Sequence, residues 1–400
     1  MEHTSNGIEN NYMNSQRVSF VCVVLCITLG LILGVLSVLP TPVTQLFRPA
    51  FIALCLLTMR LSRYYPIGAA KTHIISLLYY TFILFNFTIT KSTVSAYISI
   101  ALFIIYFVLA ANRVWTKKEI RLILITVALA CTVSSVITLV CNPGIFKNSG
   151  SAHIDFLGVI MNRNTLAFCA APGALCGMFL LLYDRYRKSF MKDIFYLACC
   201  LICSFALFSL ACRSAFFAAA VGLTCIVWQK TRDARSRQER FSRKMFAIFL
   251  ILLVLATSMF LAKGTFSSRL FEFGGDDSDS GRDVLWDEAW ELIDEKPVFG
   301  GGFDYWTDSG QTMGTHNAFL TFMVSSGWTG GILLGIFLFQ TLLAAIRTRN
   351  LIPLGFAAEV ATHTWTEPGM DYFAYIPLIL TFILIRYLKY QNKDFNTIFS

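Results

Sequence analysis

The sequence predicts an all-α polytopic membrane protein with about twelve transmembrane helices and one large periplasmic loop that contains short helices. Apolar residues make up 56% of the 400-residue chain and charged residues only 14%, whereas a soluble domain has about 25% charged residues. Apolar runs of membrane-crossing length recur along the chain, and the basic residues between them gather on one side. These observations exclude the soluble classes of protein.

The apolar runs divide the chain into three parts. Residues 1–262 hold the first nine expected spans, residues 263–316 form the periplasmic loop, and residues 317–400 hold the last three spans and a cytoplasmic tail. The first run has no small-residue cleavage site after it, which indicates a retained span rather than a signal peptide. The tenth span is long and is expected to break at Gly327. The expected spans are 18–39, 46–62, 73–90, 94–111, 120–141, 165–183, 194–211, 214–229, 245–262, 317–346, 351–363 and 371–388.

The basic residues give an independent test of this topology. With the N-terminus in the cytoplasm, most of the 33 Lys and Arg residues fall in cytoplasmic loops, as expected for a protein of the cell inner membrane. Both termini are therefore expected inside. The most basic loop, "KTRDARSRQERFSRK", is interpreted as a topological anchor, with an acidic lipid or a protein partner as the alternative. The net charge of +9 is thus explained without nucleic acid.

The loop at 263–316 holds half of the chain's 24 acidic residues. "RDVLWDEAWELIDEKP" predicts an amphipathic helix that ends before Pro297, and this helix is expected to lie along the membrane surface. Its apolar stripe is expected to consist of Val284, Leu285, Trp286, Ala289, Trp290 and Ile293.

The twelve cysteines do not form a disulfide framework, because most lie inside apolar runs where thiols behave as small hydrophobes. "CCLIC" at residues 199–203 could be a metal cluster. Packing is favoured, since no His or carboxylate lies nearby in sequence.

Three polar residues at outer ends of spans are candidates for chemistry. Arg213 lies where the seventh and eighth spans meet with almost no loop, and its alternative is an arginine that extends to lipid headgroups. Arg282 opens the amphipathic helix, and its alternative is a surface salt bridge. His316 lies at the start of the tenth span, where a neutral imidazole is a usable general base. Its alternative is an interfacial or capping histidine, although Thr315 or Asn317 could cap the helix without it.

Two arginines and one base, without a nucleophile, suggest a reaction type. Arginine forks bind phosphate oxygens in bidentate fashion, and a base can activate a hydroxyl that attacks a carbon carrying a phosphate leaving group. The sequence therefore predicts glycosyl transfer from a lipid diphosphate at the outer face of the membrane that the chain spans. "DDSD" at residues 276–279 could hold a divalent ion, but a short pattern in an acid-rich loop is weak evidence, and no metal site is expected.

A longer stretch resembles the signature loop of the O-antigen ligase and polymerase superfamily. The resemblance lies in "GRDVLWDEAWELIDEKPVFGGGFDYW…THNAFLTFMVSSGWTGGILL", where an arginine precedes a Trp-bearing helix, Pro-x-x-Gly-x-Gly, and a His-Asn that opens a helix with Gly-x-x-Gly. "ACRSAFFAAAV" and "GVIMNRNTLAFCAAPGAL" are similar to two further segments of that family. The closest resemblance is to an O-antigen ligase.

The resemblance implies roles for individual residues and substrates. Arg213 and Arg282 would contact the diphosphate of an undecaprenyl-linked glycan donor, and His316 would activate a hydroxyl of the lipid A-core acceptor, without metal or cofactor. The other expected substrate-binding residues, near the start of the sixth span and beside His316, are Arg163, Asn164 and Asn317. Membrane lipids are the other expected partners.

Two alternative functions remain at the level of sequence. A polymerase of the same superfamily would join repeat units on the carrier lipid, and a transporter would move such a lipid across the membrane. A transporter should show polar residues in the middle of several spans, whereas here they gather at the outer rim. His363 and Glu367 are interpreted as part of a turn between the last two spans, with a role near the acceptor as the alternative. His153 and Asp155, just before the sixth span, have the same two interpretations.

Overall fold

The computed structural model describes residues 115–145, 153–184, 189–233, 238, 282–302, 304–310, 314–366 and 372–391. Several sequence-based predictions lie outside these residues: the first four spans, the span at 245–262, the "DDSD" segment and Glu367.

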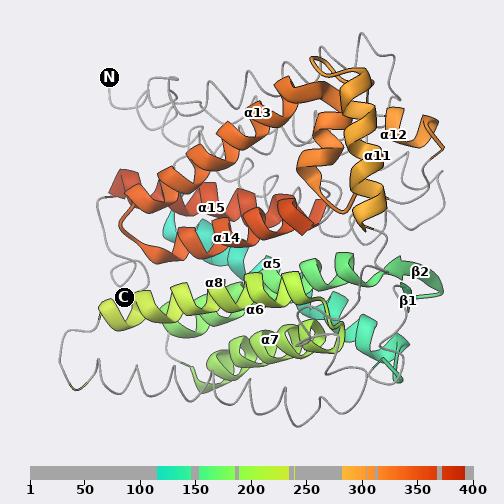
Figure 1. The fold of residues 1–400 in the computed structure, drawn as a ribbon. Coiled ribbons are helices and arrows are strands. Elements are labelled where there is room, and N and C mark those ends of the chain that lie inside the picture. Colours follow the sequence, from blue (N-terminus) through green and yellow to red (C-terminus); the bar gives the residue numbers. More distant parts are fainter. Residues whose placement is uncertain are drawn as a thin grey trace, which may run out of the picture.

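Each of the seven remaining expected spans falls on a helix (Figure 1). Four of them, α5, α6, α7 and α13, are long and apolar enough to cross a membrane. The described part is therefore a helical membrane fold, while the total of twelve spans stays a prediction. The helices are α5 (Lys117–Cys141), α6 (Arg163–Tyr183), α7 (Phe190–Ser209), α8 (Arg213–Arg232), α13 (Ala318–Arg347), α14 (Leu351–Thr366) and α15 (Tyr372–Gln391).

An antiparallel hairpin before α6 departs from the expected all-α fold. It consists of β1 (His153–Phe156) and β2 (Val159–Asn162). The two residues between the strands have φ of 55° and 80°, the left-handed values that a tight hairpin turn requires. Asn142, at the end of α5, accepts a hydrogen bond from Asp155 N (3.1 Å) and donates one to Asp155 O (2.6 Å). Strands this short carry too little periodicity to be predicted from hydropathy.

Helix α6 lies at the centre of the described bundle. It contacts α5, α7, α8, α14 and α15, and nearly all of its side chains are buried. Small residues let the neighbours approach closely: a Cβ on Gly177 would lie 2.8 Å from the backbone nitrogen of Cys200. Cys199, Cys200 and Cys203 are buried free thiols, so "CCLIC" packs as small apolar groups.

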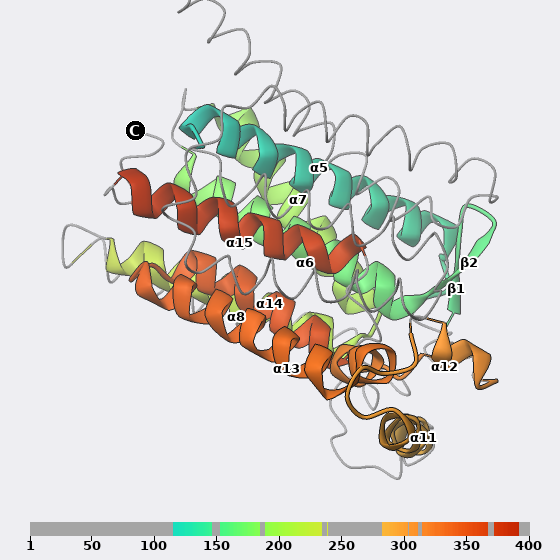
Figure 2. The same ribbon diagram turned by 90° about the horizontal axis from the view of Figure 1, so that it is seen from above.

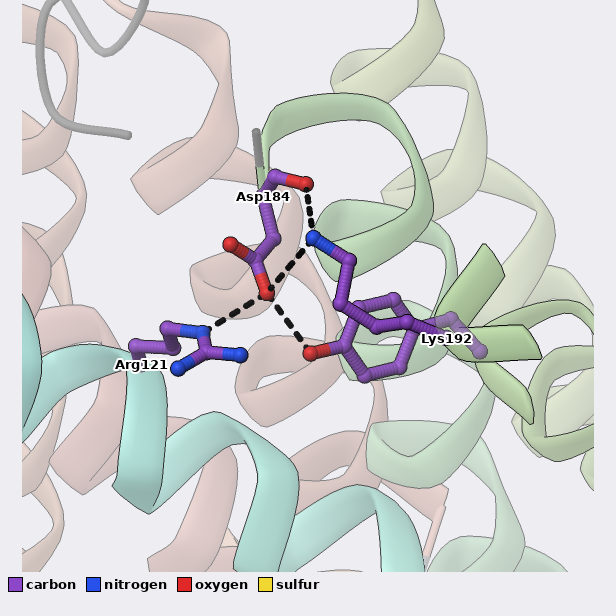
Figure 3. Close-up of polar contacts among 4 residues, drawn as sticks. Arg121, Asp184 and Lys192 are labelled. Atoms are coloured by element: carbon purple, nitrogen blue, oxygen red, sulfur yellow. Dashed lines mark hydrogen bonds and ion pairs between the residues drawn. The ribbon is translucent and has the colours of Figure 1, made fainter. Parts of the chain in front are cut away.

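A charged cluster joins α5, α6 and α7 (Figure 3). It lies where α6 ends, whereas the hairpin lies where α6 begins. The fully buried Asp184 carboxylate accepts hydrogen bonds from Arg121 Nε (2.7 Å) and Tyr196 Oη (2.6 Å). Lys192 Nζ lies 3.6 Å from the same carboxylate and donates to the Asp184 carbonyl at 2.9 Å. One carboxylate thus holds three helices together.

Replacing Asp184 with asparagine is expected to destabilise the bundle without removing its apolar packing. Charge-assisted hydrogen bonds contribute about 1.5–3 kcal/mol each, so thermal unfolding of the detergent-solubilised protein should shift down by several degrees. Asp193→Asn, which alters an exposed acid in the first turn of α7, is the matched control and should change stability by less than about 1 kcal/mol. Equal shifts for the two variants would contradict this role of Asp184.

Candidate functional site

The hairpin and two short helices, α11 (Arg282–Glu295) and α12 (Tyr305–Asp308), lie at one end of the helix bundle (Figures 1 and 2). We call this the loop end. It also holds the starts of α6 and α8 and the start of α13, and these helix starts carry most of the predicted site residues.

Helix α11 is amphipathic, as predicted, and packs against the first turns of α13. The predicted apolar stripe also includes Val284 and Trp290, but both are exposed, because at about 100° per residue they lie on the flanks of the buried face. The buried contact consists of Leu285, Ala289 and Ile293 on α11 with Leu320, Met323 and Val324 on α13.

The end of α11 is tied to α12. The hydroxyl of Tyr305 donates a hydrogen bond to the Glu295 carboxylate, and this bond raises the pKa of Tyr305 to about 12. Lys296 Nζ lies 3.9 Å from the centre of the Tyr305 ring. Because the pKa of Tyr305 in the folded protein lies above its ordinary value, the Tyr305–Glu295 hydrogen bond stabilises the fold at neutral pH. This stabilisation is lost only as pH rises through the pKa of the folded state.

The predicted break in α13 is confirmed at Gly327, where φ is 67° and ψ is −171°. The segment 297–302 crosses α13 at this break and bonds the backbone groups that the break frees. Non-helical backbone in a membrane protein needs such partners. The backbone bonds run from Trp328 N to Pro297 O (2.7 Å), from Gly301 N to Val324 O (3.0 Å) and from Gly302 N to Ser325 O (2.9 Å). The side-chain hydroxyl of Thr329 adds a bond to Val298 O (2.8 Å).

His316 does not cap α13. Asn317 is the cap, because its Oδ1 accepts hydrogen bonds from Phe319 N (2.9 Å) and Leu320 N (3.3 Å). His316 has the left-handed φ of 51°, and its side chain is half-buried. The alternative in which His316 caps the helix is therefore excluded. The side-chain oxygen of Asn317, an expected substrate-binding residue, is occupied by the cap.

The loop around His316 is held by its neighbours. Thr315 Oγ1 lies 2.7 Å from Thr321 Oγ1, one turn into α13. Trp286, one turn after Arg282 in α11, donates a hydrogen bond from its Nε1 to Thr315 O at 2.8 Å. This bond holds α11 beside the residue that precedes His316. Arg282 itself is half-buried at the first position of α11.

Helices α8 and α14 run antiparallel, and this brings the start of α8 to the end of α14. Leu351 N, at the start of α14, donates to Gln229 Oε1 near the end of α8 at 3.1 Å. Further along, a Cβ on Gly355 would lie 3.0 Å from Gly222 O. Arg213, the half-buried first residue of α8, thus lies at the loop end toward the last turn of α14.

The last turns of α14 also meet α6 and α13. The ring of His363 packs edge to face on Phe168 of α6, with ring centroids 4.3 Å apart. The rings of Trp365 and Phe319 of α13 also meet edge to face, with centroids 6.4 Å apart. Phe319 is three residues from His316. The helix starts that carry Arg213, Arg163 and His316 therefore lie around the same end of α14.

Residues 198–335 match the family model described as O-antigen ligase. This match supports the assignment of the chain to the O-antigen ligase and polymerase superfamily. Members of this superfamily are glycosyltransferase-like ligases or polymerases. The O-antigen ligase domain contains Arg213, Arg282 and His316 together with the broken helix α13.

Two further comparisons give less. No curated protein matches the sequence significantly. A solved chain, described as "Structural coordination of polymerization and crosslinking by a peptidoglycan synthase complex", is similar over 79% of this chain and 98% of its own, with 15% sequence identity and a TM-score of 0.44. This similarity does not bear on the activity.

Arg163 and Asn164 lie outside the O-antigen ligase domain and are held by local contacts. Arg163 is buried, and its Nη2 donates to Ile145 O at 3.3 Å. Asn164 N donates to Asn162 Oδ1 at 2.8 Å, so Asn162 caps α6. These contacts give both residues a part in shaping the loop end.

The turn predicted around His363 is wrong at that residue, because α14 continues to Thr366. His363 is buried on the same helical face as Glu359, one turn earlier. Glu359 is fully buried, and neither carboxylate oxygen has a hydrogen-bond partner among the described residues. Sequence analysis missed Glu359, although an acid in the middle of an apolar run was a usable signal. His153 begins β1.

Proposed function

We propose that this protein is an O-antigen ligase that transfers an undecaprenyl-diphosphate-linked polysaccharide to lipid A-core at the periplasmic face of the inner membrane. The observation that supports this most is the placement of Arg213, Arg282 and His316 at one end of the bundle, within the ligase domain. The proposal needs the donor diphosphate and the acceptor hydroxyl to meet at the loop end.

Arg213 and Arg282 would bind the diphosphate. Each is the first residue of a helix, where unpaired backbone N–H groups and the helix dipole already favour an anion. A guanidinium adds two parallel hydrogen bonds to phosphate oxygens. Their positive charge would stabilise the diphosphate as it leaves, which is why the proposal includes no metal and no cofactor.

His316 would act as the general base. Its ring would accept the proton of the acceptor hydroxyl as that oxygen forms a bond to the anomeric carbon of the donor sugar. The bond from this carbon to the phosphate oxygen breaks, and its electron pair leaves with the diphosphate toward the two arginines. The cap formed by Asn317 supports this role, because it leaves the imidazole out of the capping hydrogen bonds.

Alanine at Arg213 or Arg282 is expected to lower the rate of transfer by about 10²–10³-fold, since each removes a preorganised donor to the leaving group. Lysine should restore part of the rate, because it keeps the charge but lacks the fork. The assay is transfer of purified carrier-linked glycan to acceptor lipid in proteoliposomes. Arg232→Ala, at the opposite and exposed end of α8, is the control; a loss equal to that of Arg213→Ala would contradict the assignment.

A deletion strain separates a ligase from a polymerase. Loss of a ligase leaves long chains on the carrier lipid and unmodified core on lipid A in a lipopolysaccharide gel. Loss of a polymerase leaves core capped with a single repeat unit. We expect the first pattern, and transfer by the purified protein would distinguish either enzyme from a transporter.

A further inference from the structure

Four apolar side chains form a contiguous exposed surface at the loop end. We call Trp290, Val298, Phe299 and Trp328 the apolar patch; their exposed fractions are 40%, 55%, 58% and 46%. The rings of Trp290 and Trp328 lie 5.7 Å apart. The hydrogen bonds of Trp328 N to Pro297 O and of Thr329 Oγ1 to Val298 O hold the tip formed by Val298 and Phe299 against the same part of α13.

The apolar patch continues the exposed face of a membrane-crossing helix. After Trp328, the exposed large side chains of α13 are Ile332, Ile336, Phe339, Leu342 and Ile346. Their spacing of about one helical turn places them on one face. Because α13 is long and apolar enough to cross the bilayer, this face contacts lipid chains, and the apolar patch extends the contact toward the loop end.

The length of α13 sets the depth of the apolar patch. From Trp328 to Arg347 the helix has about 20 residues, which is enough to cross a hydrocarbon core of about 30 Å. Tryptophan is enriched where a helix leaves this core. With Arg347 at one interface, the break at Gly327 lies at the other, and the tip lies at the boundary of the core.

Two features of the crossing agree with this depth. The backbone of residues 297–302 is bonded to the broken helix, as non-helical backbone at membrane depth must be. The exposed acids of α11, among them Asp287 and Glu291, would be costly to bury and keep the rest of that helix in water.

We infer that the apolar patch inserts among the phospholipid acyl chains of the leaflet at the loop end, so that residues 298–299 form a membrane-embedded tip and α11 lies at the bilayer surface. The loop is then anchored to the bilayer at a second point besides its helix connections. The inference concerns lipid contact and does not depend on the proposed transferase activity.

Photo-crosslinking of the full-length protein in nanodiscs of phosphatidylethanolamine and phosphatidylglycerol tests this inference. A benzophenone-bearing amino acid is placed at position 299, at 339 as a lipid-facing reference and at 287 as an exposed control on α11. Mass spectrometry of the irradiated protein then measures lipid adducts. We expect similar adduct yields at 299 and 339, and about tenfold less at 287, which lies outside the hydrocarbon core.

An adduct yield at 299 as low as that at 287, with position 339 labelled, would overturn the inference. Crosslinks from 299 to a second copy of the chain would also overturn it, because they would show that protein covers the patch. If the variant at 299 does not fold, the same label at Trp290 provides the comparison with 287.

Discussion

Replacing His316 with alanine is expected to lower the rate of glycan transfer by about 10²–10⁴-fold, the usual contribution of a positioned general base. The acceptor hydroxyl would then have to lose its proton to water, while the arginines could still bind the donor. The variant should therefore keep its affinity for carrier-linked glycan. Donor binding and transfer are measured separately with the purified protein in proteoliposomes.

The backbone at His316 requires a second variant. Its φ of 51° is unfavourable for alanine, by about 1–2 kcal/mol, so a loss in His316→Ala could reflect the backbone. Asparagine tolerates left-handed φ but cannot act as a base. His316→Asn should thus be as stable as the parent protein and as inactive as His316→Ala. Activity in the asparagine variant, or an equal loss in His153→Ala, would remove His316 from the role of base.

Replacing Gly327 with alanine is expected to destabilise the whole loop end. A Cβ at this position would lie 2.4 Å from the backbone carbon and oxygen of Val298, and the φ of 67° is strained for any L side chain. The segment 297–302 must then separate from α13, with loss of its hydrogen bonds. We expect a cost of about 3–5 kcal/mol from overpacking and backbone strain together. Thermal unfolding and limited proteolysis of the loop measure it.

Gly335→Ala is the matched control for this prediction. Gly335 lies in the same helix, and a Cβ there would meet only Phe319 Cε1 at 3.7 Å, an ordinary contact. Alanine favours a helix over glycine by about 1 kcal/mol, so this variant should be as stable as the parent or slightly more. Similar losses at the two glycines would mean that any added methyl group disturbs α13, and that the crossing has no special part.

Transfer activity should fall together with stability in Gly327→Ala, because the crossing fixes α11 against α13. Arg282 begins α11, and Trp286 bonds to the residue before His316. Separation at Gly327 therefore displaces one proposed donor-binding arginine relative to the proposed base. Normal activity in a variant that has lost protection of the loop from protease would show that α11 is not needed for transfer.

The sequence by itself determined the helical membrane class, seven of the described helices, the amphipathic α11 and the break at Gly327. These features depend on local composition: an apolar run of membrane length must be a helix, because only hydrogen bonds within the segment satisfy the backbone in lipid. The arginines and the histidine were found for a similar reason, since charged groups at span ends are few and stand out.

The tertiary structure decided which groups meet. Asn317 rather than His316 caps α13, and Glu359 and His363 lie buried on one helix face. Gly301 and Gly302 bond to a break in α13 that lies more than twenty residues later. The short hairpin and the exposed sides of α11 were likewise not predictable. Each depends on contacts between segments distant in sequence, and hydropathy records only the tendency of a residue to leave water, not the neighbour against which it is buried.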